Sequence, residues 1–216
     1  MKTFTQFPNL WVHEHPLITH KLSIMRNRDT PTILFRLLLK EIALMMGYEI
    51  TGNLATKVRP IMTPLAPYDA PMLEGPGPAI VSILRAGLGM AQGLHELLPS
   101  AREGHIGLYR DHDTKRPVQY YCKLPDPSAR PFILVDPMLA TGHSAAAAVD
   151  LVRAHGVAET DIRLMVLVAA PEGVQVMLDQ HPRVAIHAAA LDERLNEHAY
   201  IVPGLGDAGD RLSGTP

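Results

Sequence analysis

The stretch Phe132-Ile133-Leu134-Val135-Asp136-Pro137-Met138-Leu139-Ala140-Thr141-Gly142-His143-Ser144 decides the fold class of this chain. Four apolar residues end in a carboxylate, a turn of mostly small residues follows, and an alanine-rich segment comes next. This order predicts a buried strand that passes through a loop into a helix. Since ligands of open α/β sheets bind beyond the carboxyl ends of the strands, we expect Asp136 to lie beside a ligand.

The turn that follows Asp136 has the properties of an anion site. Backbone N–H groups at a helix N-terminus are free to donate, and the helix dipole favours negative charge there. The small and hydroxylated residues of Ala140–Ser144 let a phosphate approach closely, although the loop lacks the Gly-Lys-Ser/Thr of a Walker A motif. A carboxylate beside such a site is favourable if it binds sugar hydroxyls or helps to hold a divalent cation. The pattern therefore indicates a phosphorylated ribose, while an ordinary turn in which Asp136 caps the helix stays open.

Strands and helices alternate along much of the chain. Unbroken apolar runs predict strands at Ala79–Leu84, His105–Tyr109, Pro131–Val135, Leu164–Ala169 and Val184–Ala190, and helical patterns occur at Leu88–Leu98, Ser144–His155 and Gly173–Gln180. Apolar strands that alternate with helices are typical of an α/β fold, a parallel sheet flanked by helices on both faces. The segment Asp111–Leu124 breaks the alternation, and we interpret it as a β-arm that projects from the sheet.

The part of the chain before the first predicted strand is expected to be helical. Apolar residues recur at helical spacing over Pro31–Met46, so we predict a helix that Thr30 caps and Gly47 ends. The proline-rich segment Thr63–Pro78 is interpreted as an irregular connection. The chain shows no internal repeat or low-complexity linker, and residues 1–216 are expected to form a single domain.

Composition argues against several classes of protein. The chain is 47% hydrophobic and 19% charged, as folded proteins are, and its formal net charge of −2 gives no bulk attraction to nucleic acid. The single cysteine, Cys122, excludes an intrachain disulfide. The N-terminus lacks the continuous apolar segment of a secretory signal, and no uncharged apolar run approaches the roughly 18 residues that span a bilayer. We therefore expect a cytoplasmic protein that binds neither nucleic acid nor membranes.

Four separate segments together resemble the uracil phosphoribosyltransferases, a family of type I phosphoribosyltransferases. VDPMLATGHS at 135–144 is similar to the loop with which this family binds phosphoribosyl pyrophosphate (PRPP). The other segments are ILRAGLGM at 83–90, LVAAPEG at 167–173 and LNEHAYIVPGLGDAGD at 195–210. The joint match implies an enzyme that converts uracil and PRPP to UMP and pyrophosphate in pyrimidine salvage.

The resemblance also implies roles for individual residues. PRPP would contact Arg85, Arg110, Asp136, Pro137, Met138, Leu139, Ala140, Thr141, Gly142, His143, Ser144 and Asp207. Uracil would contact Ile201, Gly206, Asp207 and Ala208, and the catalytic residues would be Asp136, Arg85 and Arg110. In the wider fold class the loop at Arg85 often contains a non-proline cis peptide.

The residue types suit these roles. Arg85 follows an apolar run, so it lies at a strand end, where a permanently charged guanidinium offers several donors to a polyphosphate. Tyr200–Asp210 is rich in glycine and has few side chains able to recognise a base, which indicates recognition by the main chain. Backbone N–H, C=O and N–H groups match the acceptor, donor and acceptor on one edge of uracil, and they mismatch cytosine.

One position departs from the family pattern. His143 stands where the commonest form of the loop has glycine. A histidine would be strained if the backbone there required a positive φ. A neutral substitution, or a side chain that carries charge toward the 5′-phosphate, would both fit this position.

The resemblance further implies partners and a cofactor. Mg²⁺ is expected to arrive with PRPP, since phosphates and waters usually hold it with few protein ligands. No metal site of the protein itself is predicted, because His13, His15 and His20 lack supporting cysteine or carboxylate spacing. Family members commonly form homo-oligomers and some are activated by GTP. Two other functions stay open: a phosphoribosyltransferase for another nucleobase, and a non-enzymatic regulator that keeps the fold but binds RNA.

Overall fold

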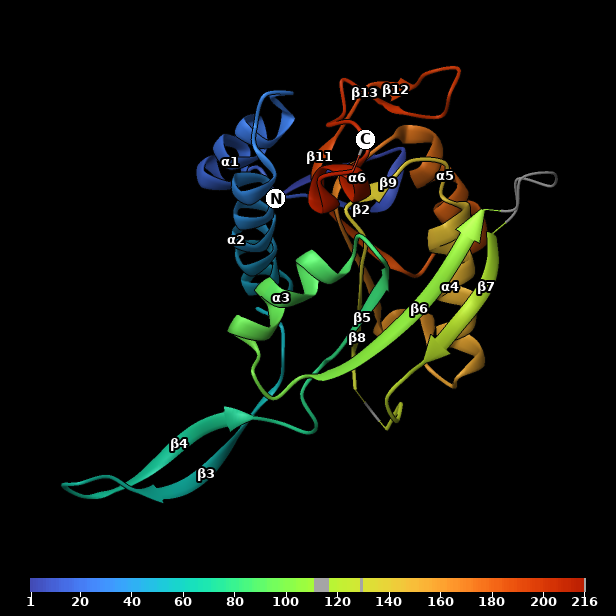
Figure 1. Ribbon diagram of the computed structural model, residues 1–216. Coiled ribbons are helices and arrows are strands. Elements are labelled where there is room, and N and C mark those ends of the chain that lie inside the picture. The colour runs from blue at the N-terminus through green and yellow to red at the C-terminus, as the bar shows by residue number, and fades with distance from the viewer. Residues whose placement is uncertain (111–116, 129, 216) are drawn as a thin grey trace.

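The computed structural model describes residues 1–110, 117–128 and 130–215. Within these residues, one sheet contains strands in the order β1-β2-β11-β10-β8-β5-β6-β7, with β9 beside β10 (Figure 1). Their bounds are β1 Lys2–Phe4, β2 Phe7–Val12, β5 Ala79–Leu84, β6 Arg102–Arg110, β7 Pro117–Lys123, β8 Phe132–Val135, β9 Met138–Leu139, β10 Ile162–Ala169 and β11 Ala185–Leu191. The pairs from β2 across to β6 are parallel, and β1 and β7 are antiparallel edge strands. The prediction of a mostly parallel sheet is confirmed.

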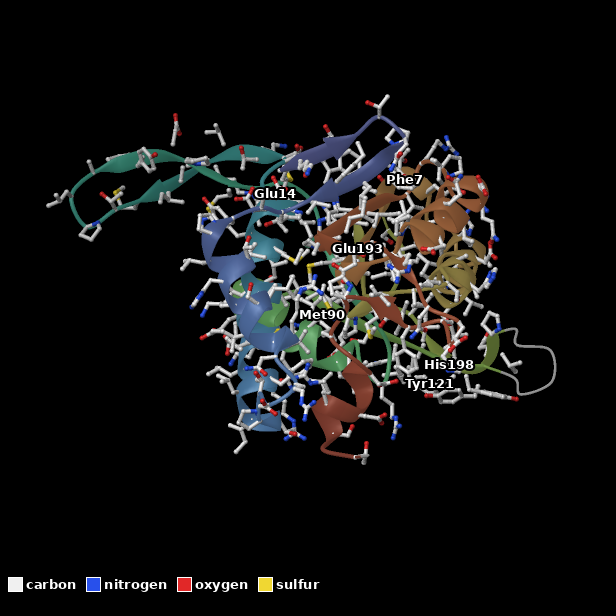
Figure 2. The ribbon with its side chains drawn as sticks, turned by 90° about the horizontal axis from the view of Figure 1, so that it is seen from above. Phe7, Glu14, Met90, Tyr121, Glu193 and His198 are labelled. Atoms are coloured by element: carbon white, nitrogen blue, oxygen red, sulfur yellow. The ribbon has the colours of Figure 1, made fainter. Side chains whose placement is uncertain are left out.

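Helices cover both faces of this sheet, as Figure 2 shows from above. The helices α1 Pro16–Arg26, α2 Thr32–Ile50, α3 Leu88–Leu97 and α6 Ala208–Ser213 lie on one face, and α4 His143–Ala154 and α5 Pro171–Gln180 lie on the other. Each face of the sheet has its own hydrophobic core, and strand β8 contributes side chains to both. Ile133 and Val135 pack in the core beneath α1, α2, α3 and α6, where Met90 also lies. Phe132 and Leu134 pack in the core beneath α4 and α5. Burial on both faces is the reason that this strand is an unbroken apolar run.

The predicted ends of α2 were wrong at both termini. Pro31, not Thr30, is the N-cap residue, and the Thr30 hydroxyl instead donates to the Ile24 carbonyl at 2.5 Å. Gly47 lies inside the helix, which continues to Ile50. A side chain at Gly47 would collide with Leu94 of α3, so this glycine permits close packing of two helices.

The interpretation of Thr63–Pro78 as irregular was also wrong. Strands β3 Thr56–Met62 and β4 Pro67–Leu73 pair antiparallel, and their hairpin projects from the rest of the molecule (Figure 1). Proline is tolerated here because each strand of a two-stranded hairpin has one open edge that needs no donor. Pro60, Pro67 and Pro71 all lie within the paired residues.

The predicted arm at Asp111–Leu124 is described only in part. Its second half forms β7, which pairs with β6 from His105 opposite Lys123 to Arg110 opposite Pro117. Residues 111–116 lie outside the described residues. In the described parts of the chain, no helix is both long and apolar enough to cross a membrane.

Candidate active site

The loop after β8 is fastened to the neighbouring strand. The Asp136 amide donates to the Met165 carbonyl at 3.2 Å, and the Leu167 and Val168 amides donate to the Pro137 carbonyl at 3.0 and 3.2 Å. Met138 and Leu139 then form β9 beside the end of β10. These contacts hold Asp136 at the carboxyl edge of the sheet, as the strand-end rule predicts.

The loop turns into α4 at Gly142, which has a φ of 81° and is the N-cap residue. A Cβ at this position would approach the Gly173 carbonyl to 2.7 Å, so glycine is required by conformation and by space. His143 follows as the exposed first residue of α4, and among the described non-glycine residues only Ala199 has a positive φ. The strain considered for His143 is therefore absent, because the left-handed residue is its neighbour.

Two adjoining cavities lie at this edge. The smaller, of about 120 Å³, is lined by Asp136, Met138, Leu139, Ala140, Thr141, Gly142, Ser144 and Ala145. The larger, of about 380 Å³, is lined by Leu84, Arg85, Ala86, Leu108, Asp136, Met138, Asp207, Ala208 and Gly209. Asp136 and Met138 line both cavities. We call the smaller one the loop cradle and the larger one the central cavity.

Most of the expected site residues line these two cavities. Pro137 is buried and His143 is exposed beside the cradle, and neither lines it. Ile201 is buried in β13 Ile201–Val202, and Gly206 is exposed with a φ of 77°, but neither lines the central cavity. Arg110 is the last residue of β6, and its side chain lies outside the described part of the structure.

Sequence reasoning missed four residues of the central cavity: Leu84, Ala86, Leu108 and Gly209. The first two flank Arg85, and the peptide bond between Leu84 and Arg85 is cis, as the resemblance implied for this loop. Gly209 lies inside the C-terminal motif. Proximity to a residue already assigned could have suggested these three.

Comparison with known proteins identifies the family. The profile of the family described as uracil phosphoribosyltransferase matches residues 12–215. The chain belongs to the uracil phosphoribosyltransferase family. The uracil phosphoribosyltransferase of Rhodospirillum centenum is 63% identical over 215 residues, covering 100% of both chains, and that of Paraburkholderia phymatum is 60% identical over 211 residues, covering 98% of this chain and 97% of the relative.

Solved structures share the fold of this chain. The AQ2163 protein of Aquifex aeolicus matches with a TM-score of 0.88 at 33% identity, covering 94% of this chain and 97% of that one. A hypoxanthine-guanine phosphoribosyltransferase of Bacillus anthracis has a TM-score of 0.51 at 13% identity, covering 73% of this chain and 79% of its own. The second likeness shows only a shared type I phosphoribosyltransferase fold.

The electrostatics of the two cavities centre on Asp136. Burial, with a smaller contribution from the nearby Asp207 carboxylate, raises the pKa of the Asp136 carboxyl to about 7. The Met138 amide, 3.5 Å from Oδ1, acts in the opposite direction. Asp136 is therefore a carboxylate whose charge is poorly compensated by the protein, and hydroxyl donors or a cation brought by a ligand would stabilise it.

The raised pKa predicts how stability changes with pH. Between the ordinary carboxyl pKa of about 3.9 and about 7, the folded chain holds more protons at Asp136 than the unfolded chain, so this group's contribution to stability falls as pH rises. Asp136→Asn removes that contribution. The free energy of unfolding can be measured with urea at pH 5 and pH 8 for both proteins. Relative to the wild type, the variant should be more stable at pH 8 than at pH 5 by on the order of 1–2 kcal/mol. The same difference in free energy of unfolding at both pH values would contradict this.

Proposed function

We propose that the chain transfers the phosphoribosyl group of PRPP to N1 of uracil, giving UMP and pyrophosphate. One observation carries the site assignment: Asp136 lines both a cradle at the N-terminus of α4 and a larger cavity with Arg85 and Asp207 on its wall. PRPP has a phosphate, a ribose and a pyrophosphate in the same order. The cradle would hold the 5′-phosphate, Asp136 the ribose hydroxyls, and the central cavity the pyrophosphate and the base.

The reaction follows from this placement. Uracil N1 attacks the anomeric carbon, the bond from that carbon to the pyrophosphate oxygen breaks, and its electron pair leaves with pyrophosphate. N1 loses its proton to the released pyrophosphate or to water, and main-chain contacts to the base favour that loss. Asp136 faces the positive charge that develops on the ribose, and Arg85 with Arg110 would receive the negative charge on the leaving group. Catalysis then comes mainly from positioning and fixed charges.

Uracil would be recognised by backbone groups of Ile201, Gly206, Asp207 and Ala208. Asp207 and Ala208 line the central cavity beside Arg85, and Gly206 is exposed directly before them. Asp207 would also contact PRPP. Backbone donors and acceptors that are fixed in place reject a base with the wrong edge strongly, because a buried group is left unpaired.

Mg²⁺ would enter with PRPP. The described residues contain no group of three or more His, Cys, Asp or Glu side chains that could hold a metal ion by themselves. Asp136 and Asp207 nevertheless line one cavity, and their mutual repulsion gives a cation a favourable place. Asp136 and Asp207 would help to hold Mg²⁺ there, and the ion would supply positive charge that stabilises the pyrophosphate as it leaves.

An assay of the purified chain tests the reaction. PRPP and Mg²⁺ are supplied with uracil, cytosine, hypoxanthine or orotate, and the nucleotides are separated by chromatography. UMP from uracil should form at least about 100-fold faster than any other nucleotide. Preferred use of another base would establish the alternative substrate, and salt-dependent RNA binding without UMP formation would establish the RNA-binding alternative.

We also propose that the chain forms a homo-oligomer through its projecting hairpin. Apolar side chains of β3, β4 and their turn are strongly exposed, among them Ile61, Met62, Leu65 and Tyr68. Exposed apolar groups gathered on one element are typical of an interface. Light scattering should show an oligomer, and the double variant Ile61→Asp with Leu65→Asp should give a smaller species.

The control for this experiment is Gln180→Glu, which adds charge at an exposed site on α5 and should leave the mass unchanged. An unchanged mass in the hairpin variant would place the interface elsewhere, for example at Leu37, Leu44 and Met45 of α2. GTP added to the light-scattering and UMP assays tests activation, for which a rise in rate is the expected result.

A further inference from the structure

The loop that precedes α6 is held from outside the central cavity by an ion pair. This loop, Pro203–Asp207, follows the hairpin of β12 Arg194–Leu195 and β13, near which Glu193 and His198 are labelled in Figure 2. Arg26, the last residue of α1, donates to both carboxylate oxygens of Asp192, at 2.8 and 2.5 Å. Asp192 follows β11, and its side chain is only 4% exposed.

The pair binds both backbone groups of one glycine. The Gly204 amide donates to Asp192 Oδ2 at 3.0 Å, and the Gly204 carbonyl accepts from Arg26 Nη1 at 2.6 Å. Gly204 has a φ of 60°, and a Cβ there would collide with the Ile201 carbonyl. No other residue type fits this position without moving the loop, so the ion pair and the glycine together determine the path of the chain.

A second arginine ties the next residue to the same end of α1. Arg211 of α6 donates to the Leu205 carbonyl at 2.9 Å and to the Met25 and Asn27 carbonyls at 2.5 and 2.7 Å. Its guanidinium lies 4.4 Å from the centre of the Phe35 ring. The carbonyls of Gly204 and Leu205 are thus engaged by arginines, and within this loop the groups from Gly206 to Ala208 remain to recognise the base together with Ile201.

We propose that Arg26 and Asp192 are positioning residues that set the affinity and selectivity for uracil, an inference that rests on the proposed uracil role of this loop. Neither residue lines the central cavity, so both act through Gly204. A base recognised by the main chain depends on such support, because backbone donors cannot adjust by changing rotamer. Stability alone is a weak reason to retain a buried ion pair, since apolar replacements often stabilise as well.

The test separates uracil binding from PRPP binding. Arg26→Lys keeps the charge but loses the planar fork that reaches Asp192 and Gly204 together, and Asp192→Asn keeps the shape but loses the charge. Each variant should raise KM for uracil about tenfold or more and leave KM for PRPP within about twofold. Discrimination against cytosine should fall as well. Thermal unfolding of each variant reports whether the fold is intact.

Lys21→Ala is the matched control. It removes another partly buried ion pair of α1, between Lys21 and Glu41 at 2.6 Å, away from the loop. Its KM for uracil should equal that of the wild type. The inference is overturned if Arg26→Lys and Asp192→Asn leave KM for uracil unchanged, raise both KM values equally, or match Lys21→Ala. Failure of the proposed function is distinguishable, because then the wild-type chain itself makes no UMP.

Discussion

Replacing Asp136 with asparagine is expected to lower kcat for UMP formation by about 100-fold or more, while the chain stays folded. The carboxylate lies on the wall that both cavities share, and in the proposed site it would face the ribose, where positive charge develops during the reaction. Asparagine has nearly the same size but carries no charge and has only one oxygen to accept hydroxyl hydrogens. Initial rates with saturating uracil and PRPP measure the effect, and circular dichroism with thermal unfolding verifies the fold.

Asp179→Asn provides the control for this variant. Asp179 is an exposed carboxylate of α5 that accepts from Gln175, so its loss should leave the rate within about twofold of the wild type. A near-normal rate of UMP formation in Asp136→Asn would contradict the assigned role.

Replacing Arg85 with alanine should lower kcat/KM for PRPP by on the order of 100-fold to 1000-fold. Arg85 lines the central cavity together with Asp136, and the pyrophosphate would lie there. Its guanidinium offers several donors in a plane and keeps its charge at neutral pH. Arg85→Lys restores the charge without the fork and should fall between the wild type and Arg85→Ala. The measurement is kcat/KM for PRPP at saturating uracil.

Arg28→Ala is the matched control, because it also removes an arginine, but one whose side chain is 94% exposed at the surface. Its kcat/KM for PRPP should equal that of the wild type. If Arg85→Ala did the same, the pyrophosphate would have to lie elsewhere.

The sequence predicted the central sheet well because its strands are buried on both faces. Ala79–Leu84 was predicted with the bounds of β5, and the run ending at Val135 corresponds to β8. The local sequence pattern was less informative for a strand that pairs with a distant part of the chain. Strand β2 was not predicted, since it becomes part of the sheet only by pairing with β11 near the other end of the chain. The hairpin β3–β4 was missed because its prolines resemble those of an irregular segment.

The residues of the candidate site also differ in whether the sequence could predict them. Asp136 and Arg85 were predictable because each follows an apolar run, and strand ends carry ligands in this class of fold. The support of the uracil loop was not predictable. Arg26 and Asp192 are 166 positions apart, and neither belongs to a periodic pattern. The raised pKa of Asp136 likewise depends on burial and on Asp207, which only the folded chain brings near.

A crystal structure of the chain with UMP would test the central claim most directly, namely that one strand-end site holds both substrates. We predict the 5′-phosphate in the cradle at Ala140–Ser144, the ribose hydroxyls on the Asp136 carboxylate, and the uracil edge against backbone groups of Gly206 to Ala208. UMP bound with its phosphate away from the N-terminus of α4, or with its base out of reach of the Gly206–Ala208 backbone, would contradict it.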